Sequence, residues 1–310
     1  MASRTAGGTD HEDAAVSDAN AVTICVCTYR RPSLFETLKS FERLEGTEGL
    51  MLSVVVIDND LTDDLGPRIE ELARTYPLPL RYVHAPAQNI SIARNAALDS
   101  VTTRWAALID DDETAAPDWL AQLLAAREGV QAVIGQSVAQ YGAGLPGWAA
   151  RCDFHSNRIE GSVANAYTSN ALLDMAFIRA NGLRFRVALG RTGGEDTIFF
   201  REFAEAGGRI VYCPQAKVSE EVPPARATMA WVRRRKYRAG QIHGLLCREF
   251  DRRAYRLLFL TAGAKAIFSS GMALATIPGS DASRRWLARA ALHTGALHYR
   301  IHPAILEEYA

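Results

Sequence analysis

Four acidic residues stand side by side at positions 110–113, immediately after the apolar stretch 105–109. Carboxylates packed this closely repel one another unless a cation lies among them. Open carboxylate groups suit Mg²⁺ or Mn²⁺, which also bind the phosphates of a substrate. A divalent ion here would stabilise the negative charge on a departing diphosphate. The alternative interpretation is a solvated loop that caps the helix beginning near Pro117.

A second set of residues suited to phosphate lies at 231–238, where the sequence WVRRRKYR carries five positive charges on one expected helix. Arginine binds phosphate through a planar fork of donors. With its aromatic side chains, this run could bind a diphosphate or an acceptor carried on a lipid phosphate. The residues concerned are Trp231, Arg234, Arg235 and Arg238. A solvated basic face is the other interpretation.

Short apolar segments alternate with helical patterns between residues 21 and 137. The expected strands are 22–28, 52–57, 80–84, 105–109 and 132–137. The expected helices are 33–44, 66–76, 91–101 and 117–127. This alternation predicts an α/β fold with a mainly parallel sheet flanked by helices. Ligands bind such sheets at the carboxyl ends of the strands.

Polar side chains follow three of these strands at the point where each strand ends. Thr28 and Tyr29 follow the first strand, Asp58 follows the second, and the acidic run follows the fourth. Because the carboxyl ends of parallel strands share one edge of a sheet, we expect these groups to gather in one site. This placement favours a binding site over a solvated loop at 110–113.

The chain after residue 138 is less regular. A glycine-containing turn at 190–194 leads into Glu195-Asp196, and strands are expected at 209–213 and 216–219. Beyond Pro223-Pro224 the sequence turns basic, and we expect it to stay helical to about residue 299. The small, polar and acidic residues 1–20 predict a disordered leader.

Net charge and cysteine content limit the class of protein. Lys plus Arg total 35 and Asp plus Glu total 35, which argues against nucleic acid as a partner, because nucleic-acid binders carry a basic excess. The five cysteines lack CxxC spacing and predict buried thiols in a reducing compartment. We therefore expect a cytoplasmic protein.

Residues 257–277 form an apolar stretch with a single charge, Lys265, and arginines on both sides. The stretch is long enough to span a bilayer. A lysine at the centre of a span costs ~2.5–3.5 kcal/mol, however. We therefore expect a core-packed or membrane-surface helix, whose basic flanks favour a peripheral contact with anionic lipid at the inner face of the cell membrane.

Five short motifs occur in order along the chain: VTICVCTYRRP at 22–32, VVVIDND at 54–60, NISIARNA at 89–96, ALIDDDE at 107–113 and GGED at 193–196. Together they resemble the family 2 glycosyltransferases of the GT-A fold, particularly the bacterial enzymes of cell-surface polysaccharide synthesis. The resemblance covers roughly residues 22–240. It implies a GT-A-like catalytic domain at 21–225, with a nucleotide-binding half at about 21–138 and an acceptor half at about 139–225. A basic helical region at 226–310 would follow.

The resemblance assigns donor binding to residues that match these motifs: Thr28, Tyr29, Asp58, Arg94, Asp110 and Asp111. The first two would line the base pocket, and Asp58 would hydrogen-bond uracil or an equivalent base, although Asp-Asn-Asp also favours a turn. Arg94 would face the diphosphate or ribose, since arginine at a helix start favours phosphate. A surface helix arginine is the alternative. The two aspartates would contact the ribose and the sugar.

Metal and catalytic roles also follow from the resemblance. Asp112 would ligate Mg²⁺ or Mn²⁺, and Glu220 lies where relatives often place a histidine as a further metal contact. An exposed glutamate before a proline turn is an equal alternative for Glu220. In the motif Glu195-Asp196, Asp196 would be the general base, a role that typically contributes ~10²–10⁴-fold. Helix capping is the structural alternative.

The implied function is an inverting transfer of a single sugar from a nucleotide-diphosphate donor, with a UDP-sugar favoured. The acceptor would be a saccharide or a lipid-linked molecule. Processive polysaccharide synthases carry QxxRW near residue 231, and this chain lacks that motif, which favours one sugar per event.

Two other hypotheses remain open from the sequence. Residues 110–114 also fit DxDxT, the nucleophile motif of haloacid-dehalogenase-type phosphatases. That fold normally begins at the motif, whereas three strand–helix units precede it here. The second alternative is a non-catalytic nucleotide-binding protein on the same fold.

Overall fold

A computed structural model describes residues 20–159, 163 and 166–307. Its strands are β1 (Ala21–Thr28), β2 (Met51–Asp58), β3 (Leu80–His84), β4 (Trp105–Asp110), β5 (Glu113–Ala115), β6 (Ala132–Gln140), β7 (Asn170–Asp174) and β8 (Ile210–Glu221). Its helices are α1 (Leu34–Phe41), α2 (Gly66–Ala73), α3 (Ile90–Ser100), α4 (Trp119–Ala125), α5 (Gly147–Cys152), α6 (Met175–Ala180), the 3₁₀ turn η2 (Val187–Leu189), α7 (Glu195–Glu205), α8 (Met229–Phe250), α9 (Arg252–Ala275) and α10 (Asp281–Ile301). The leader expected at 1–20 lies outside the described residues apart from its last position.

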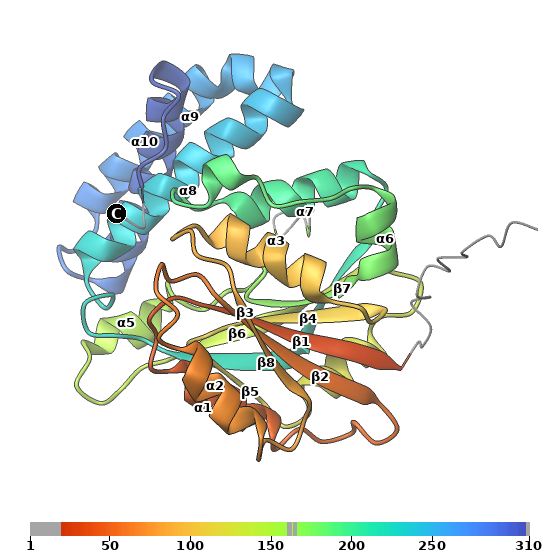
Figure 1. Ribbon diagram of the computed structural model, residues 1–310. Coiled ribbons are helices and arrows are strands. Elements are labelled where there is room, and N and C mark those ends of the chain that lie inside the picture. Colours follow the sequence, from red (N-terminus) through yellow and green to blue (C-terminus); the bar gives the residue numbers. More distant parts are fainter. Residues whose placement is uncertain (1–19, 160–162, 164–165, 308–310) are drawn as a thin grey trace, which may run out of the picture.

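Within the described ranges, the strands form one sheet in the order β3-β2-β1-β4-β7-β6-β8-β5 (Figure 1). β3, β2, β1 and β4 are parallel, β6 and β8 share their direction, and β7 and β5 run against their neighbours. The predicted mainly parallel α/β sheet is confirmed. Because strands from the acceptor half join the same sheet, the two expected halves share one scaffold.

The two strands predicted at 209–213 and 216–219 are one strand, β8. It pairs with β6 in two stretches, and the register shifts between Ile134 and Gln136. Pro214 lies in the part of β8 between the two paired stretches. Proline has no N–H to donate to a ladder, so the irregularity at this position has a simple cause.

Helices cover both faces of the sheet (Figure 1), and each packs on it through its apolar side. α1, α2 and α4 pack on one face through residues such as Leu38, Ile69 and Trp119. α3, α6 and α7 pack on the other face, where Ala97 and Phe199 are fully buried. The central strands are buried on both sides, which explains their near-continuous apolar sequences. All five cysteines are free thiols, but only Cys25, Cys213 and Cys247 are buried as expected, and the other two are partly exposed.

The helical C-terminal region is also confirmed, but as separate helices. α8 ends at Phe250, and the side chain of the next residue, Asp251, caps α9 by accepting a hydrogen bond from the Ala254 N–H. α10 follows a turn at 276–280 and packs between α8 and α9 at one end of the molecule (Figure 1). Among the helices of the described chain, α9 alone has the length and composition of a membrane span.

Candidate active site

The loop after β1 is tied to the acidic run through Asp111. The Thr28 hydroxyl donates to Asp111 Oδ2 at 2.7 Å, and the Tyr29 N–H donates to the same oxygen at 3.4 Å. Arg31 Nε lies 3.8 Å from Asp111 Oδ1. Asp111 is buried, so these contacts provide the partners that a buried carboxylate requires. Its side chain therefore holds the β1 loop against the end of β4.

Asp58, at the end of β2, is also buried and fully engaged by the protein. Its Oδ1 accepts from the Asp60 N–H at 2.9 Å, and its Oδ2 accepts from the Tyr82 hydroxyl at 3.0 Å. The turn chemistry expected of Asp-Asn-Asp is therefore present. The side chain lies on the same sheet edge as Thr28, because β1 and β2 are paired in register there.

Tyr29 projects from this edge with 40% of its surface exposed. Gln88 donates a hydrogen bond to its hydroxyl at 2.7 Å, and the Arg30 guanidinium lies 5.5 Å from its ring centre. Within the described ranges, Arg30 and Gln88 are two of the three non-glycine residues with positive φ. Such backbone conformations concentrate at ligand sites. The aromatic ring is therefore partly exposed beside two residues with left-handed backbone conformations.

The four acidic residues do not act as one cluster. Glu113 begins β5 and points into the protein, where it accepts hydrogen bonds from the Asp110 N–H and, at 2.6 Å, the Ser137 hydroxyl. By contrast, the Asp110 side chain is 42% exposed and the Asp112 side chain 18%. The short turn between β4 and β5 thus buries the second and fourth carboxylates and leaves the first and third facing the site.

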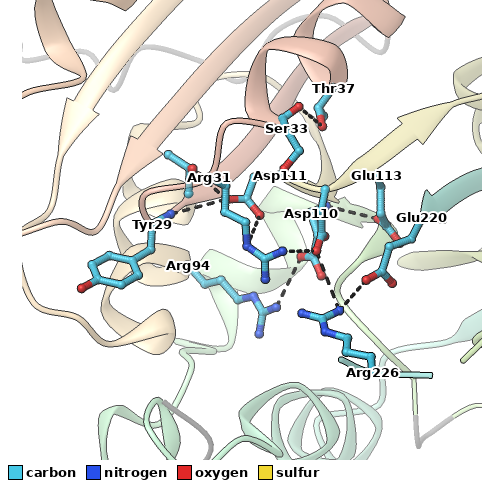
Figure 2. Close-up of polar contacts among 12 residues, drawn as sticks. Tyr29, Arg31, Ser33, Thr37, Arg94, Asp110, Asp111, Glu113, Glu220 and Arg226 are labelled. Atoms are coloured by element: carbon cyan, nitrogen blue, oxygen red, sulfur yellow. Dashed lines mark hydrogen bonds and ion pairs between the residues drawn. The ribbon is translucent and has the colours of Figure 1, made fainter. Parts of the chain in front are cut away.

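Arginines approach the exposed carboxylates from different sides (Figure 2). Arg31 Nη1 lies 2.5 Å from Asp112 Oδ2, and Arg226 Nη1 lies 4.0 Å from the same oxygen. Arg226 also pairs with Glu220 at 2.6 Å. Glu220 comes from β8, which pairs with β5 at this position. The sheet therefore brings Glu220 beside Asp112 across about 100 residues of sequence.

Glu195 and Asp196 begin α7 after Gly194, whose φ of +88° is accessible mainly to glycine. A Cβ at this glycine would lie 2.7 Å from the Ile242 side chain of α8, so a larger residue would be too close to α8 at this position. Asp196 Oδ1 accepts from the Thr197 N–H at 2.7 Å. The turn expected at 190–194 therefore leads directly into α7, and Asp196 lies near enough to the end of β4 for its charge to raise the pKa of Asp110.

Arg94 lies between the acidic residues after β4 and those at the start of α7, and it contacts one residue of each group. Its buried guanidinium pairs with Glu195, and Nη2 lies 3.6 Å from Asp110 Oδ1. The other carboxylate oxygen of Glu195 is buried and makes no hydrogen bond. Arg94 is therefore a buried member of the site, and the alternative of a surface helix arginine is wrong. Its charge lies between the carboxylates after β4 and those at the start of α7.

The nearby arginines do not fully offset the cost of ionising the carboxylates of Asp110, Glu195 and Glu220. Burial raises the pKa of Glu195 to about 7 despite Arg94. Burial and the charge of Asp112 raise the pKa of Glu220 to about 7 despite Arg226. Although 42% of the Asp110 side chain is exposed, the surrounding protein reduces the hydration of its charged form, and this loss together with Asp112 and Asp196 raises its pKa against the effect of Arg94. Acids that hinder one another's ionisation favour an added cation.

The fit of a divalent ion can be tested on these side chains. In the part of the chain described here, no three His, Cys, Asp or Glu side chains are arranged to hold one ion together. Mg²⁺, however, is commonly bound by one or two carboxylates plus substrate phosphates rather than by an all-protein cage. Asp110, Asp112 and Glu220 are hard oxygen ligands, and the charge of Asp112 raises the pKa of the other two. The donor set therefore fits Mg²⁺ or Mn²⁺ completed by a diphosphate.

Comparison with known families decides what kind of protein this is. The model of the family described as glycosyl transferase family 2 matches residues 23–183, more than half of the chain. The chain belongs to the family 2 glycosyltransferases. The matched segment includes residues 110–114, so the phosphatase interpretation of that motif is set aside.

Relatives of this glycosyltransferase include the succinoglycan biosynthesis protein ExoM of Rhizobium meliloti (strain 1021). The two are 40% identical over 296 residues, which cover 93% of this chain and 95% of ExoM. A glucosyl-dolichyl phosphate glucuronosyltransferase of Haloferax volcanii is 28% identical over 245 residues, covering 68% of this chain and 72% of that protein.

Solved structures share the GT-A fold of this glycosyltransferase. A mannosyltransferase from Pyrobaculum calidifontis, in complex with GDP-Man and Mn²⁺, has a TM-score of 0.62 at 21% identity and covers 91% of this chain and 87% of its own. S. aureus TarS in complex with UDP-GlcNAc has a TM-score of 0.53 at 15% identity, with coverage of 90% and 91%. At these identities the likeness shows the fold alone.

Of the residues on α8 that were expected to bind phosphate or acceptor, some lie near the site and Arg234 contacts the C-terminal tail. The ring of Trp231 stacks on His155 at 5.0 Å, and the Arg235 guanidinium lies 5.2 Å from the ring centre of Trp231. The charge of Arg235 opposes the rise in the pKa of Glu220, so Arg235 and Trp231 lie near that carboxylate at the border of the site. Arg234 instead donates to the Glu307 carbonyl in the C-terminal tail. Arg238 lies one turn further along α8 and is half-buried.

Sequence reasoning missed three residues that organise this site. Arg31 and Arg226 provide the ion pairs of Asp112, and Tyr82 holds Asp58. Arg31 was detectable, because it follows the first strand within a motif of the family. Arg226 was not, since its partner Glu220 meets Asp112 only through the pairing of β5 with β8.

Proposed function

We propose that this family 2 glycosyltransferase transfers one sugar, with inversion, from a nucleotide-diphosphate donor to a hydroxyl of a saccharide or lipid-linked acceptor. The observation that carries the proposal is the pair of acidic groups on either side of Arg94. Asp110 and Asp112 lie at the end of β4, and Asp196 lies at the start of α7. One group suits a leaving diphosphate and the other suits an attacking hydroxyl.

The donor would bind along the edge formed by β1, β2 and β4. Tyr29 offers its exposed ring to the base, and Asp58 and Thr28 form the rigid wall behind it. We favour a uridine diphosphate sugar as the donor class. Asp110 and Asp111 would border the ribose and sugar. Arg94 lies close enough to Asp110 to place a positive charge near the diphosphate.

Asp112, with Asp110 and Glu220, would hold Mg²⁺ or Mn²⁺. When bound there, the ion would neutralise charge on the departing nucleoside diphosphate. The Pyrobaculum mannosyltransferase of the same fold was solved with GDP-Man and Mn²⁺, which supports this assignment. Arg31 and Arg226, which pair with Asp112 here, would then be free to contact phosphate oxygens.

Asp196 would take the proton from the acceptor hydroxyl as its oxygen attacks the anomeric carbon. The new glycosidic bond forms on the face opposite the breaking bond to the diphosphate, so the configuration inverts. Burial raises the pKa of Asp196 above its usual range, which makes it a stronger base. Glu195 fixes Arg94 and so positions the start of α7.

The acceptor would enter beside α8, where Trp231 and Arg235 border the site. Two relatives support the acceptor class by their names: a succinoglycan biosynthesis protein and an enzyme of glucosyl-dolichyl phosphate. Aromatic rings and arginines suit a saccharide attached to a phosphate.

A panel of UDP-, GDP- and dTDP-sugars tests the proposal by thermal shift, with and without Mn²⁺, followed by assays of donor hydrolysis. A bound donor raises the melting temperature by mass action. We expect one nucleotide sugar to stabilise the protein most when Mn²⁺ is present and to be turned over. Tight UDP binding without turnover of any sugar nucleotide would instead indicate a non-catalytic nucleotide-binding protein.

A further inference from the structure

The outward side of α9 is unusual for a helix at the surface of a protein. α9 packs on α10 and α8 through a narrow stripe of mostly small residues: Leu258, Ala262, Ala266, Ser269 and Ala273. Their spacing of three or four residues places them on one side of the helix. The side opposite this stripe faces away from the protein and is apolar.

The outer face of α9 consists of Leu257, Leu260, Ile267, Phe268 and Leu274. Their exposed fractions range from 47% at Leu257 to 87% at Leu274. Leu260, Ile267 and Leu274 are seven residues apart, which is two helical turns, so they form a continuous line. A continuous exposed apolar surface of this kind marks an interaction site rather than scattered surface residues.

The surroundings of the outer face are strongly basic. Residues 252–300 contain eight basic residues and one acidic residue, Asp281, although the whole chain is balanced. Arg252, Arg253 and Arg256 lie at the start of α9. Lys265 lies further along α9, on the side of the helix that faces α10.

A groove of about 400 Å³ runs between α9 and α10 beside the outer face, and Lys265, Phe268, Trp286 and Arg289 are among its lining residues. Trp286 packs edge-on against Phe268, with ring centres 5.6 Å apart, and the Arg289 guanidinium lies 5.0 Å from the centre of the Trp286 ring. Tryptophan next to cations is typical of the boundary between headgroups and acyl chains.

We propose that the outer face of α9 docks this protein on a bilayer containing anionic phospholipid, with the helix axis lying along the membrane surface. The apolar line would enter the boundary between headgroups and acyl chains. Lys265 and Arg289, in the groove beside it, would contact lipid phosphates. An apolar face combined with basic flanks is the pattern of helices that bind at this boundary.

Two other arrangements fit the contacts less well. If α9 crossed the membrane, α10 would be drawn in with Arg289 and His293, because the two helices pack along their length. A dimer formed through the outer face would place two copies of the same basic surroundings against each other, because a two-fold contact pairs identical surfaces. An anionic bilayer complements both the apolar line and the charge.

The proposed surface also has a consistent place relative to the active site. α8 carries Trp231 and Arg235 at the site and packs against α9 and α10. Docking through α9 therefore anchors the helices that border the acceptor side. The docking itself does not require the glycosyl transfer proposed above.

Sedimentation of the full chain with lipid vesicles tests the proposal. We expect binding to phosphatidylcholine vesicles with about 30% phosphatidylglycerol, weak binding to phosphatidylcholine alone, and a loss of binding as salt increases. Ile267→Asp and Leu274→Asp should each weaken binding at least tenfold. Lys265→Gln should weaken it about fivefold.

Ser270→Asp is the matched control, because Ser270 is exposed on the same helix outside the apolar line. It should bind vesicles like the unaltered protein. Equal binding of Ile267→Asp and Ser270→Asp would overturn the proposal. So would retention in vesicles after an alkaline carbonate wash, which indicates a span, or an Ile267-dependent dimer that ignores vesicles. Nucleotide-sugar hydrolysis without vesicles should be equal in all variants, which separates lost docking from lost catalysis.

Discussion

The candidate site has a nucleotide end and a transfer end, and its carboxylates are stabilised differently at the two ends. At the nucleotide end, Asp58 and Asp111 are buried, and each accepts hydrogen bonds from the protein itself. At the transfer end, Asp110, Asp112 and Glu220 are more exposed and are balanced by ion pairs with arginines. Both ends hold carboxylates beside one sheet edge.

This difference indicates which part of the site is complete before a ligand arrives. Hydrogen bonds with fixed geometry hold the nucleotide end in place, and the Thr28 hydroxyl opposes the rise that burial causes in the pKa of Asp111. At the transfer end, the charge of Asp112 raises the pKa of Asp110 and of Glu220, so a cation or a proton would relieve the repulsion. We therefore propose that the first end recognises the donor and that the second is completed by donor and metal.

The largest expected effect comes from removing the base at the transfer end. Asp196→Asn should lower kcat by about 10²–10⁴-fold, because the amide cannot accept the acceptor's proton. The donor-induced rise in melting temperature should persist, since Asp196 would contact the acceptor rather than the nucleotide. Transfer rates and thermal shifts on the same preparation measure both quantities.

Glu205→Gln is the matched control for this change. Glu205 lies on the same helix and pairs with Arg201 on the exposed surface. Its loss should leave kcat within about twofold, since exposed ion pairs contribute little. Similar losses in the two variants would mean that Asp196 acts through the stability of α7 and not through its carboxylate.

The next largest effect should be a difference in unfolding free energy between variants at the nucleotide end and at the transfer end. Asp111→Ala leaves the Thr28 hydroxyl and the Tyr29 N–H without their partner, so it should cost about 1–3 kcal/mol of unfolding free energy. Asp110→Ala removes an exposed carboxylate from a crowded acidic group and should change stability by less than about 0.5 kcal/mol. Urea denaturation measures both. Equal costs would remove the distinction between a closed end and an open end.

The sequence predicted the sheet, its flanking helices, the strand-end positions of Thr28, Asp58 and Asp110, and the helix-start position of Arg94, because buried parallel strands and helix starts leave local patterns. It also predicted the glycine-containing turn at 190–194, after which α7 begins at Glu195. The split of residues 110–113 into two inward and two outward carboxylates was not predictable. That split depends on the pairing of β5 with β8, and so on residues about 100 positions away.

The outward surface of α9 was predicted only in part. Its composition indicated either core packing or a membrane surface, and the structure shows one side of the helix packed and the other exposed. Hydrophobicity alone could not divide the helix, because apolar residues occur all around it. Only the position of α10 determines which side is covered.

A smaller effect should appear in the pH dependence of stability. At the transfer end, the folded pKa values of Glu195 and Glu220 are about 7, above the usual range of glutamate. Their contribution to stability is therefore fully present below pH ~4 and is lost as the pH rises through ~7. Above that, the charged carboxylates should gain most from a cation.

Accordingly, Mg²⁺ with UDP at about 100 times its Kd should raise the melting temperature by about 5–10 °C at pH 8, and by less than half of that at pH 5.5. Differential scanning fluorimetry at the two pH values measures the difference. An equal or larger rise at pH 5.5 would show that the transfer end does not carry unbalanced negative charge.

The central claim is that the transfer end, and not the nucleotide end, receives a divalent ion. Electron paramagnetic resonance of Mn²⁺ titrated in the presence of UDP tests it most directly, with the unaltered chain, Asp112→Asn and, as a matched change on an exposed aspartate, Asp118→Asn. We expect one Mn²⁺ to bind per chain when UDP is present, no such binding by Asp112→Asn, and full binding by Asp118→Asn. Mn²⁺ binding that survives in Asp112→Asn, or that fails in the unaltered chain with UDP, would contradict the claim.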